Sequence, residues 1–231
     1  MIMPDKEGIR ELFDDIAPGY DSFNHRSSFG ADRSWRRKAV REIADTTRPI
    51  QVLDVATGTA DFAIAVADKA APGSHVTGID ISEGMLRIGR GKCQGKPIDL
   101  LTAQAEDLPF PDSSFDRVCV AFGVRNFEDR AKGLSEMCRV LRKGGKLVIL
   151  ELSYPANRLI RFFYKLYSLR VLPRMGARMT GNLDAFTYLP ESILRFPLPA
   201  AFMPMLHEAG FNTVRHKQFI FGVCRMYVAY K

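Results

Sequence analysis

Two carboxylates stand in neighbouring strand-like segments of the chain and could help to bind a nucleoside. Asp54 lies within Gln51-Val-Leu-Asp-Val55, which leads into a loop of small residues, and Asp80 ends the run Val76-Thr-Gly-Ile-Asp80. A carboxylate at the end of the second strand of a βαβ unit accepts hydrogen bonds from the hydroxyls of a ribose. A glycine such as Gly58 after the first strand lets a ligand approach the backbone. The pattern predicts one βαβ unit of a nucleotide-type site.

The first loop differs from a dinucleotide-binding fingerprint in its glycines and in its charge. The fingerprint G-x-G-x-x-G places a pyrophosphate against helix-terminal amides, whereas this loop reads Ala56-Thr-Gly-Thr-Ala-Asp61. Asp54 and Asp61 at its two ends would repel a pyrophosphate but attract a ligand with an amino group and a sulfonium. S-adenosylmethionine fits that description better than NAD. The alternative is a structural βα turn with a surface acid.

Further cofactor-site candidates follow the second and third strands. Ile81 and Met85 come directly after Asp80, and Thr102-Ala-Gln-Ala-Glu-Asp107 follows the third strand. A small residue and an acid at a strand end can offer one donor and one acceptor to the edge of adenine. We therefore place three residues on the adenine side, together with Asp107 as a further acid: Gln104, Ala105 and Glu106.

The loop after the fourth strand, Phe122-Gly-Val-Arg-Asn-Phe127, is expected to form the floor of the transfer site. It lacks the Asp/Asn-Pro-Pro-aromatic sequence with which amino-group methyltransferases of nucleobases hold their substrate. Arg125 and Asn126 instead offer a cation and an amide, which suit an oxygen on a substrate that is methylated elsewhere. The alternative for Arg125 is an ordinary surface charge.

The first 45 residues are expected to form a helical lid over the cofactor. A helix that starts near Ile9 is broken at Pro18-Gly19, and the pattern predicts a loop after it that carries Tyr20, Asn24 and His25. Tyr20 is the candidate for chemistry. A single loop histidine is more often merely solvated, so His25 is not assigned a role.

Strand-like and helical segments alternate through the middle of the chain. Strands are expected at 98–103, 115–121 and 146–152, and a helix at 131–142 that ends at Lys143-Gly-Gly145. A helix at 199–209 and two strands at 212–219 and 222–230 follow. The expected fold is α/β: a Rossmann-like, mostly parallel seven-stranded sheet with a C-terminal antiparallel hairpin. That is the strand plan of class I S-adenosylmethionine-dependent methyltransferases.

Composition favours one domain. The chain has 231 residues, of which 46% are hydrophobic, and no linker or repeat divides it. We divide it into the lid at 1–45, a cofactor-binding core at 46–153, an insertion at 154–198, and a C-terminal helix and hairpin at 199–231. The four cysteines lack metal-site spacing, so reduced thiols and no metal are expected. Without a signal peptide or spanning segment, we expect a cytoplasmic protein.

The insertion carries a basic amphipathic segment. Residues 155–183 include no acid but six cations: Arg158, Arg161, Lys165, Arg170, Arg174 and Arg178. Apolar residues recur between them at helical spacing. Two interpretations remain open, namely reversible contact of 156–178 with the inner face of a membrane and packing of the apolar face on the core. The same helix could also form a homo-oligomer interface.

Four segments together resemble the ubiquinone/menaquinone biosynthesis C-methyltransferase family over nearly the whole chain. They are Phe13-Asp-Asp-Ile-Ala-Pro-Gly-Tyr-Asp21, Val52-Leu-Asp-Val-Ala-Thr-Gly-Thr-Ala-Asp61, Ala103-Gln-Ala-Glu-Asp-Leu-Pro-Phe110 and Phe122-Gly-Val-Arg-Asn126. The resemblance implies cofactor contacts at Thr59, Asp80, Gln104 and Ala105. It also implies C-methylation of a polyprenylated hydroquinone, with demethylmenaquinol to menaquinol preferred. The chain departs from the family at Thr57 and Ala60, where glycine is common, and at Ala121, where serine is frequent.

Aromatic carbon becomes a good nucleophile once a ring hydroxyl has lost its proton. We expect Arg125, Tyr20 and Asp61 to form a hydrogen-bonded group that orients this hydroxyl and relays its proton, with Asn126 beside them. Three other functions remain open. They are methylation of a ubiquinone precursor, methylation of another small molecule or RNA, and a non-catalytic role in a quinone-biosynthesis assembly. No nucleic-acid module is visible, so nucleic acid is not an expected partner.

Overall fold

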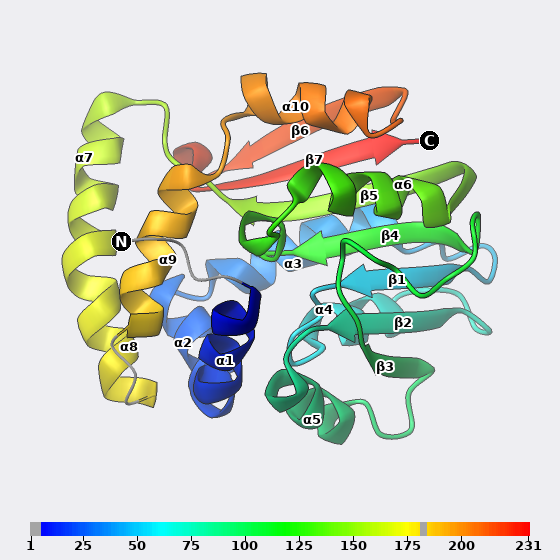
Figure 1. Cartoon of the computed structure of the whole chain (residues 1–231), viewed down its shortest axis with the longest axis horizontal. Helices are drawn as coiled ribbons and strands as arrows, with labels where there is room; N and C mark the ends of the chain where they lie inside the picture. Colours follow the sequence, from blue (N-terminus) through cyan, green and yellow to red (C-terminus); the bar gives the residue numbers. More distant parts are fainter. Residues whose placement is uncertain (1–5, 181–183) are drawn as a thin grey trace.

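A single seven-stranded sheet organises the computed structural model, which describes residues 6–180 and 184–231 (Figure 1). Its strand order is β3-β2-β1-β4-β5-β7-β6. The bounds are β1 Gln51–Val55, β2 His75–Asp80, β3 Ile98–Thr102, β4 Phe115–Ala121, β5 Leu141–Leu152, β6 Thr213–Phe219 and β7 Cys224–Tyr230. Strands β1 to β5 pair in parallel, whereas β7 runs antiparallel to both β5 and β6. The expected sheet and its C-terminal hairpin are confirmed.

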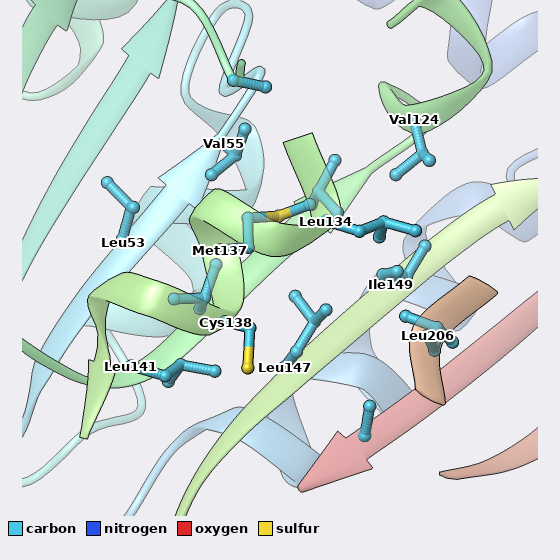
Figure 2. Close-up of a cluster of buried hydrophobic side chains, with 14 of the residues drawn as sticks. Leu53, Val55, Val124, Leu134, Met137, Cys138, Leu141, Leu147, Ile149 and Leu206 are labelled. Carbon is cyan, nitrogen blue, oxygen red and sulfur yellow. The ribbon is translucent and has the colours of Figure 1, made fainter. Parts of the chain in front are cut away.

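Helices cover both faces of the sheet because its central strands are apolar on both sides. Helices α6 (Arg130–Val140) and α10 (Pro199–Glu208) pack on Leu53, Leu147 and Ile149, and Figure 2 shows the α6 part of this cluster. On the opposite face, α3 (Ala31–Ile43) and α4 (Asp61–Ala67) pack on Val52 and Val148. Helix α5 (Glu83–Lys92) lies along β2 and β3. Burial on both faces fixes β1 and β4 at the centre, where a doubly wound sheet has its ligand crevice.

A helical layer covers the carboxyl ends of the parallel strands. It combines α1 (Lys6–Ile16) and α2 (Tyr20–Ser27) with α7 (Arg158–Leu166), α8 (Leu172–Thr180) and α9 (Asp184–Arg195). A π-helical turn at Tyr167–Val171 joins α7 to α8, and the two form the rod at the left of Figure 1. Phe23 of α2 and Phe186 of α9 are buried against each other, with ring centroids 4.2 Å apart. The N-terminal helices and the insertion therefore share one small core.

Two local expectations were wrong. Pro18 and Gly19 belong to a short 3-10 turn (Ala17–Gly19), so Tyr20, Asn24 and His25 lie on helix α2 instead of in a loop. A proline is tolerated in the first turn of a helix, because the N–H it lacks has no helical partner there. The expected helix at 131–142 ends early, at Val140, and β5 begins at once. Gly144, with φ +76°, and Gly145 form an irregularity in the pairing with β4 instead of a helix cap.

Residues 1–5 of the expected lid and residues 181–183 within the expected insertion lie outside the described residues. Within the described ranges, none of the helices is long and apolar enough to cross a bilayer.

Candidate active site

Side-chain hydrogen bonds hold the loop between β1 and α4 against the end of β2. Thr57 donates its hydroxyl to Asp54 at 2.7 Å and its backbone N–H to the carbonyl of Ile79 at 2.9 Å. The N–H of Gly58 donates to the Asp80 carboxylate at 2.8 Å. Gly58 has a φ of +56°, a conformation that glycine adopts without strain. The loop is therefore held between two strand ends, with its backbone close to Asp80.

Asp80 lies where a ribose-binding carboxylate was expected. Its second oxygen accepts the N–H of Ser82 at 2.9 Å, so both oxygens already accept backbone hydrogen bonds. Burial raises the pKa of Asp80, and these hydrogen bonds only partly oppose it. Each carboxylate oxygen has a second lone pair, which leaves room for a ligand hydroxyl.

Asp54, on strand β1, supports the loop through its hydrogen bond with Thr57. Its side chain is buried, and burial raises its pKa to about 7 although the Thr57 hydroxyl favours the charged form. Asp54 also accepts a contact from the Cys119 thiol at 3.5 Å. The expected role of Asp54 at the cofactor is therefore indirect in this structure, since it acts on the loop through Thr57.

The main cavity, called here the cofactor cavity, lies at the carboxyl ends of β1, β2 and β4, with a volume of about 470 Å³. Eight expected site residues line it: Tyr20, Gly58, Asp80, Ile81, Met85, Ala105, Glu106 and, from the loop after β4, Asn126. Ala121 also lines it, where the family often has serine. Of the other cofactor candidates, Asp54, Thr59 and Gln104 are outside the lining formed by the described residues. Most of the predicted cofactor residues are thus brought together.

The floor of the cofactor cavity depends on a close backbone approach. Gly123 follows β4, and a Cβ atom at this position would lie 2.6 Å from the Cβ of Ala56 in the β1 loop. Since real Cβ atoms do not approach so closely, position 123 requires glycine. The close approach holds the loops after β1 and β4 together.

Thr59 and Asp61 fasten the lid helix instead of facing the cavity. Thr59 donates its hydroxyl to Asp21 of α2 at 2.6 Å. Lys92 of α5 donates to Asp21 at 2.9 Å, to Thr59 at 3.1 Å, and also to Asp61. Arg36 of α3 lies 3.6 Å from Asp61. This cluster of Asp21, Thr59, Asp61 and Lys92, the latch, ties α2 to α4 and α5.

Arg125 has a buried partner that the sequence analysis missed. Its Nη1 donates to Oε1 of Glu151 at 2.8 Å and to the carbonyl of Phe122, while its backbone N–H donates to Oε2 of Glu151 at 3.1 Å. The two side chains are 5% and 0% exposed. Burial opposes the charged form of Arg125, but the Glu151 carboxylate outweighs it, so the pKa of Arg125 is raised. Arg125 therefore stays cationic and cannot act as a general base.

A second cavity, the apolar cavity, lies beneath the helical layer and has a volume of about 260 Å³. It shares Phe13, Tyr20 and Phe122 with the cofactor cavity, so the two meet there. Arg125 is the one charged side chain among the described residues that line it. The Nε of Arg125 is buried and finds no hydrogen-bond partner within the described part of the chain. A buried guanidinium that carries one unpartnered donor is thus part of the wall of an apolar chamber beside the cofactor cavity.

The insertion reaches this site directly. Tyr188 of α9 is buried, lines the apolar cavity and donates its hydroxyl to Oδ1 of Asn126 at 3.0 Å. Burial raises the pKa of Tyr188, so it remains a hydrogen-bond donor at neutral pH. Asn126 is thereby oriented from the insertion, although it lies on the loop after β4.

The expected hydrogen-bonded group of Arg125, Tyr20 and Asp61 is not formed. Arg125 pairs with Glu151, and Asp61 pairs with Lys92 in the latch. Tyr20 lines both cavities and lies near enough to Arg125 to contribute, after Glu151, to the raised pKa of that residue. His25, which was left without a role, pairs with Asp32 at 2.8 Å. The signal for Glu151 was an acid within an otherwise apolar strand, whereas no local signal pointed to Lys92.

Comparison with known proteins gives consistent results over the whole chain. A model of the ubiE/COQ5 methyltransferase family matches residues 1–231. The chain is 45% identical over 229 residues to the ubiquinone/menaquinone biosynthesis C-methyltransferase UbiE of Geobacter sulfurreducens, with 97% of this chain and 89% of that protein covered. It is 43% identical over 229 residues to the demethylmenaquinone methyltransferase of Bacteroides fragilis, with 97% and 93% covered.

Among solved structures, the fold resembles an S-adenosylmethionine-dependent methyltransferase of Thermotoga maritima, described as a possible histamine N-methyltransferase. The TM-score is 0.67 at 18% identity, with 96% of this chain and 98% of that chain covered. This likeness shows the fold alone and confirms the expected class I methyltransferase architecture. The names of both curated relatives agree with the expected activity, an S-adenosylmethionine-dependent C-methylation in quinone biosynthesis. The resemblance stated from the loop motifs is confirmed, and the chain belongs to the ubiE/COQ5 methyltransferase family.

Proposed function

We propose that the chain transfers a methyl group from S-adenosylmethionine to a ring carbon of a polyprenylated hydroquinone, with demethylmenaquinol as the preferred acceptor. The observation that carries the proposal is the meeting of two chemically different cavities at Phe13, Tyr20 and Phe122. One offers a carboxylate at the end of β2, and the other is an apolar chamber in which Arg125 is the one cation among the described lining residues. A nucleoside-type methyl donor suits the first, and a hydrophobic ring with an acidic hydroxyl suits the second.

The residues present fit the cofactor. Asp80 would accept the ribose hydroxyls, Ala105 and Glu106 would face the adenine, and Gly58 lets the ligand approach the backbone. When bound, S-adenosylmethionine supplies an electrophilic methyl group on a cationic sulfur. Ile81 and Met85 add apolar surface to the same lining. No metal ion is needed for this transfer.

Arg125 would stabilise the phenolate form of the acceptor. Its guanidinium lines the apolar cavity beside the acceptor ring, and its raised pKa keeps this group charged while the hydroxyl ionises. In an apolar cavity such a charge is worth more than in water, because less solvent screens it. Tyr20, at the junction of the two cavities, would orient the ring, and Asn126 would be held by Tyr188 beside it.

Asp61 keeps a more distant role than the sequence analysis gave it. Through Lys92 it holds the latch, which fixes α2 and hence Tyr20 at its N-terminus. We propose that α1 and α2 serve as the lid of the expected 1–45 segment. Asp14 of α1 supports this, since it accepts hydrogen bonds from Ser82 at 2.6 Å and Gly84 at 2.8 Å at the start of α5.

Reversible contact with a membrane surface through residues 156–178 fits a prenylated acceptor, with the protein on the inner face of the membrane. Helix α7 has no fully buried residue, and four of its large apolar side chains, Leu159, Phe162, Phe163 and Leu166, are exposed instead of packed on the core. This favours the membrane interpretation of the segment over core packing.

The test is turnover of extracted demethylmenaquinol with labelled S-adenosylmethionine, preceded by calorimetry with the cofactor alone. Binding and transfer to demethylmenaquinol are the expected results, and Arg125→Gln should lower kcat by about 100-fold or more while cofactor affinity is kept. Transfer only to a ubiquinone precursor would show that this precursor, and not demethylmenaquinol, is the acceptor. Cofactor binding without any transfer would leave the non-catalytic role, and no cofactor binding would refute the proposal.

A further inference from the structure

Three segments that are far apart in sequence expose large apolar side chains around one mouth of the apolar cavity. Phe29, in the turn between α2 and α3, is 87% exposed, and Ile220 and Phe221, between β6 and β7, are 52% and 70% exposed. Phe29, Ile220 and Tyr167 of the α7–α8 rod line the cavity. Apolar side chains gathered at a cavity mouth indicate a surface that is covered in use.

The turn between β6 and β7 is strained as well as exposed. Ile220 and Phe221 have φ values of +43° and +55°, in the left-handed region that a β-branched or bulky residue rarely occupies. Neither side chain is buried in return. Strain of this kind persists where the display of a side chain is useful.

Helix α7 contributes the third segment, and its two faces have opposite roles. Its inner face packs through tyrosines: Tyr164 lines the apolar cavity, and the Tyr167 hydroxyl in the following turn donates to the carbonyl of Ser27 at 2.8 Å. The outer apolar side chains are 42% to 66% exposed, namely Leu159, Phe162, Phe163 and Leu166. A helix that packs through its tyrosines and leaves its leucines and phenylalanines outside is suited to an apolar partner.

Beside this apolar surface lies a hollow formed by four exposed arginines, called here the arginine hollow. Arg170, Arg174 and Arg178 follow one another at four-residue spacing along the rod, and Arg26 of α2 faces them. The described residues that line the hollow include no acid, and its volume is about 420 Å³. Four like charges repel one another, so such a cluster is stabilised by an anion.

We propose that this face docks on an anionic phospholipid bilayer. The arginine hollow holds lipid phosphates, and Phe29, Phe221 and the outer face of α7 enter the layer below the headgroups. The mouth of the apolar cavity then lies against the lipid. The inference rests on the proposed function in one respect, because this mouth would admit the prenyl chain of the acceptor directly from the bilayer.

Charge decides between a bilayer and a second copy of the chain. A symmetric dimer places the same patch on both subunits, so residues 155–178, with six cations and no acid, would face another six. An anionic lipid surface neutralises them instead. Guanidinium groups also form bidentate hydrogen bonds with phosphate, which suits the arginine hollow.

The test is flotation of the full-length protein with vesicles of phosphatidylcholine, with and without phosphatidylglycerol. Wild-type protein should float with the anionic vesicles in a salt-sensitive way. Arg170→Gln/Arg174→Gln should bind about 30-fold more weakly, since each cation near the surface contributes about a factor of five. The matched control is Arg41→Gln/Lys143→Gln, which removes two exposed cations at the end of α3 and the start of β5 and should change binding by no more than about threefold.

An apolar pair of variants tests the rim. Phe221→Ser should weaken binding about tenfold, whereas Leu101→Ser, which alters an exposed residue of β3 at the other edge of the sheet, should not. Equal losses in the arginine pair and its control, or no binding to anionic vesicles, would overturn the proposal. The proposal would also fail if Arg170→Gln/Arg174→Gln had a lower oligomer mass than the wild type by light scattering but floated equally well, because the face would then join copies of the chain. Binding of inorganic phosphate without vesicle binding would overturn it too.

Turnover separates this inference from the proposed function. Flotation needs no substrate, so it reports docking even if demethylmenaquinol is not the acceptor. If both ideas hold, Arg170→Gln/Arg174→Gln keeps kcat with detergent-dispersed quinol and loses turnover about as much as binding when the quinol is embedded in vesicles. Equal turnover of Arg170→Gln/Arg174→Gln and its control Arg41→Gln/Lys143→Gln on vesicle-embedded quinol would contradict docking as the entry route.

Discussion

The buried pair of Arg125 and Glu151 makes stability and activity separable. In Arg125→Met, the Glu151 carboxylate keeps its backbone donors, Arg125 N–H at 3.1 Å and Leu152 N–H at 2.8 Å, but loses the guanidinium. Its side chain is 0% exposed, so water cannot replace the lost cation. Removing one partner of a fully buried ion pair costs about 3 to 5 kcal/mol of unfolding free energy.

Adding Glu151→Gln to Arg125→Met should recover much of that loss. The glutamine carbonyl still accepts a backbone hydrogen bond, and the uncompensated charge is gone. The other backbone N–H loses its acceptor, because the glutamine NH2 group is itself a donor, and this costs about 1 to 3 kcal/mol, so the double variant should be more stable than Arg125→Met by about 2 kcal/mol. Neither variant can stabilise a phenolate, so kcat should fall by about 100-fold or more in both.

Urea unfolding followed by circular dichroism gives the two free energies, and labelled methyl transfer to demethylmenaquinol gives kcat. The reasoning fails if the double variant is no more stable than Arg125→Met, because the carboxylate would then not be the source of the loss. It also fails if the double variant regains turnover along with stability, because the arginine would then act only by supporting the fold.

Three further predictions concern the cofactor loop and the latch. Burial raises the pKa of Asp54 to about 7 in the folded state, against an ordinary value of 3.8. Between about pH 4 and pH 7 the folded state therefore binds more protons than the unfolded state, so wild-type stability falls as pH rises. Asp54→Asn should remove this dependence, at most about 1.4 kcal/mol per pH unit, as measured by urea unfolding at pH 5 and pH 8. Asp80→Ala should weaken S-adenosylmethionine binding by roughly 100-fold in calorimetry, since two hydrogen bonds to a charged group are lost. Unchanged affinity would show that the ribose does not bind at Asp80. Lys92→Met should increase hydrogen exchange in α2 and raise KM for the cofactor more than it lowers kcat, with only about 1 kcal/mol of lost stability because Lys92 is partly exposed; protection of α2 as in the wild type would show that the latch does not hold the lid.

Much of the cofactor side could be predicted because it depends on strand ends. Parallel strands bring their carboxyl ends to one edge of a sheet, so the positions of Gly58, Asp80 and Ala105 follow from the strand pattern alone. The same logic placed Asn126 and Arg125 at the floor of the site. These residues need only the right strand order, which alternation of strands and helices determines.

The polar partners could not be predicted in the same way. Glu151 meets Arg125 across 26 residues, and Lys92 meets Asp21 across 71, through long side chains whose directions depend on how the helices pack. Spacing along the chain carries no information on such contacts. Tyr20 was expected in a loop because proline and glycine precede it, whereas Phe23 on the same helix is buried against Phe186, and that tertiary packing keeps the segment helical.

The two positions where this chain lacks the glycines common in its family have different consequences. Thr57 is outside the left-handed region, so its side chain adds no backbone strain, and its hydroxyl supplies the bond to Asp54 that a glycine could not make. Ala60 has a φ of +66°, which costs about 1 to 2 kcal/mol for a residue with a Cβ. Ala60 is nevertheless fully buried, and a Cβ at Gly89 of α5 would lie 3.3 Å from its methyl group. The loop therefore keeps its shape through a hydrogen bond at position 57 and close packing at position 60, and the cofactor cavity does not require either glycine.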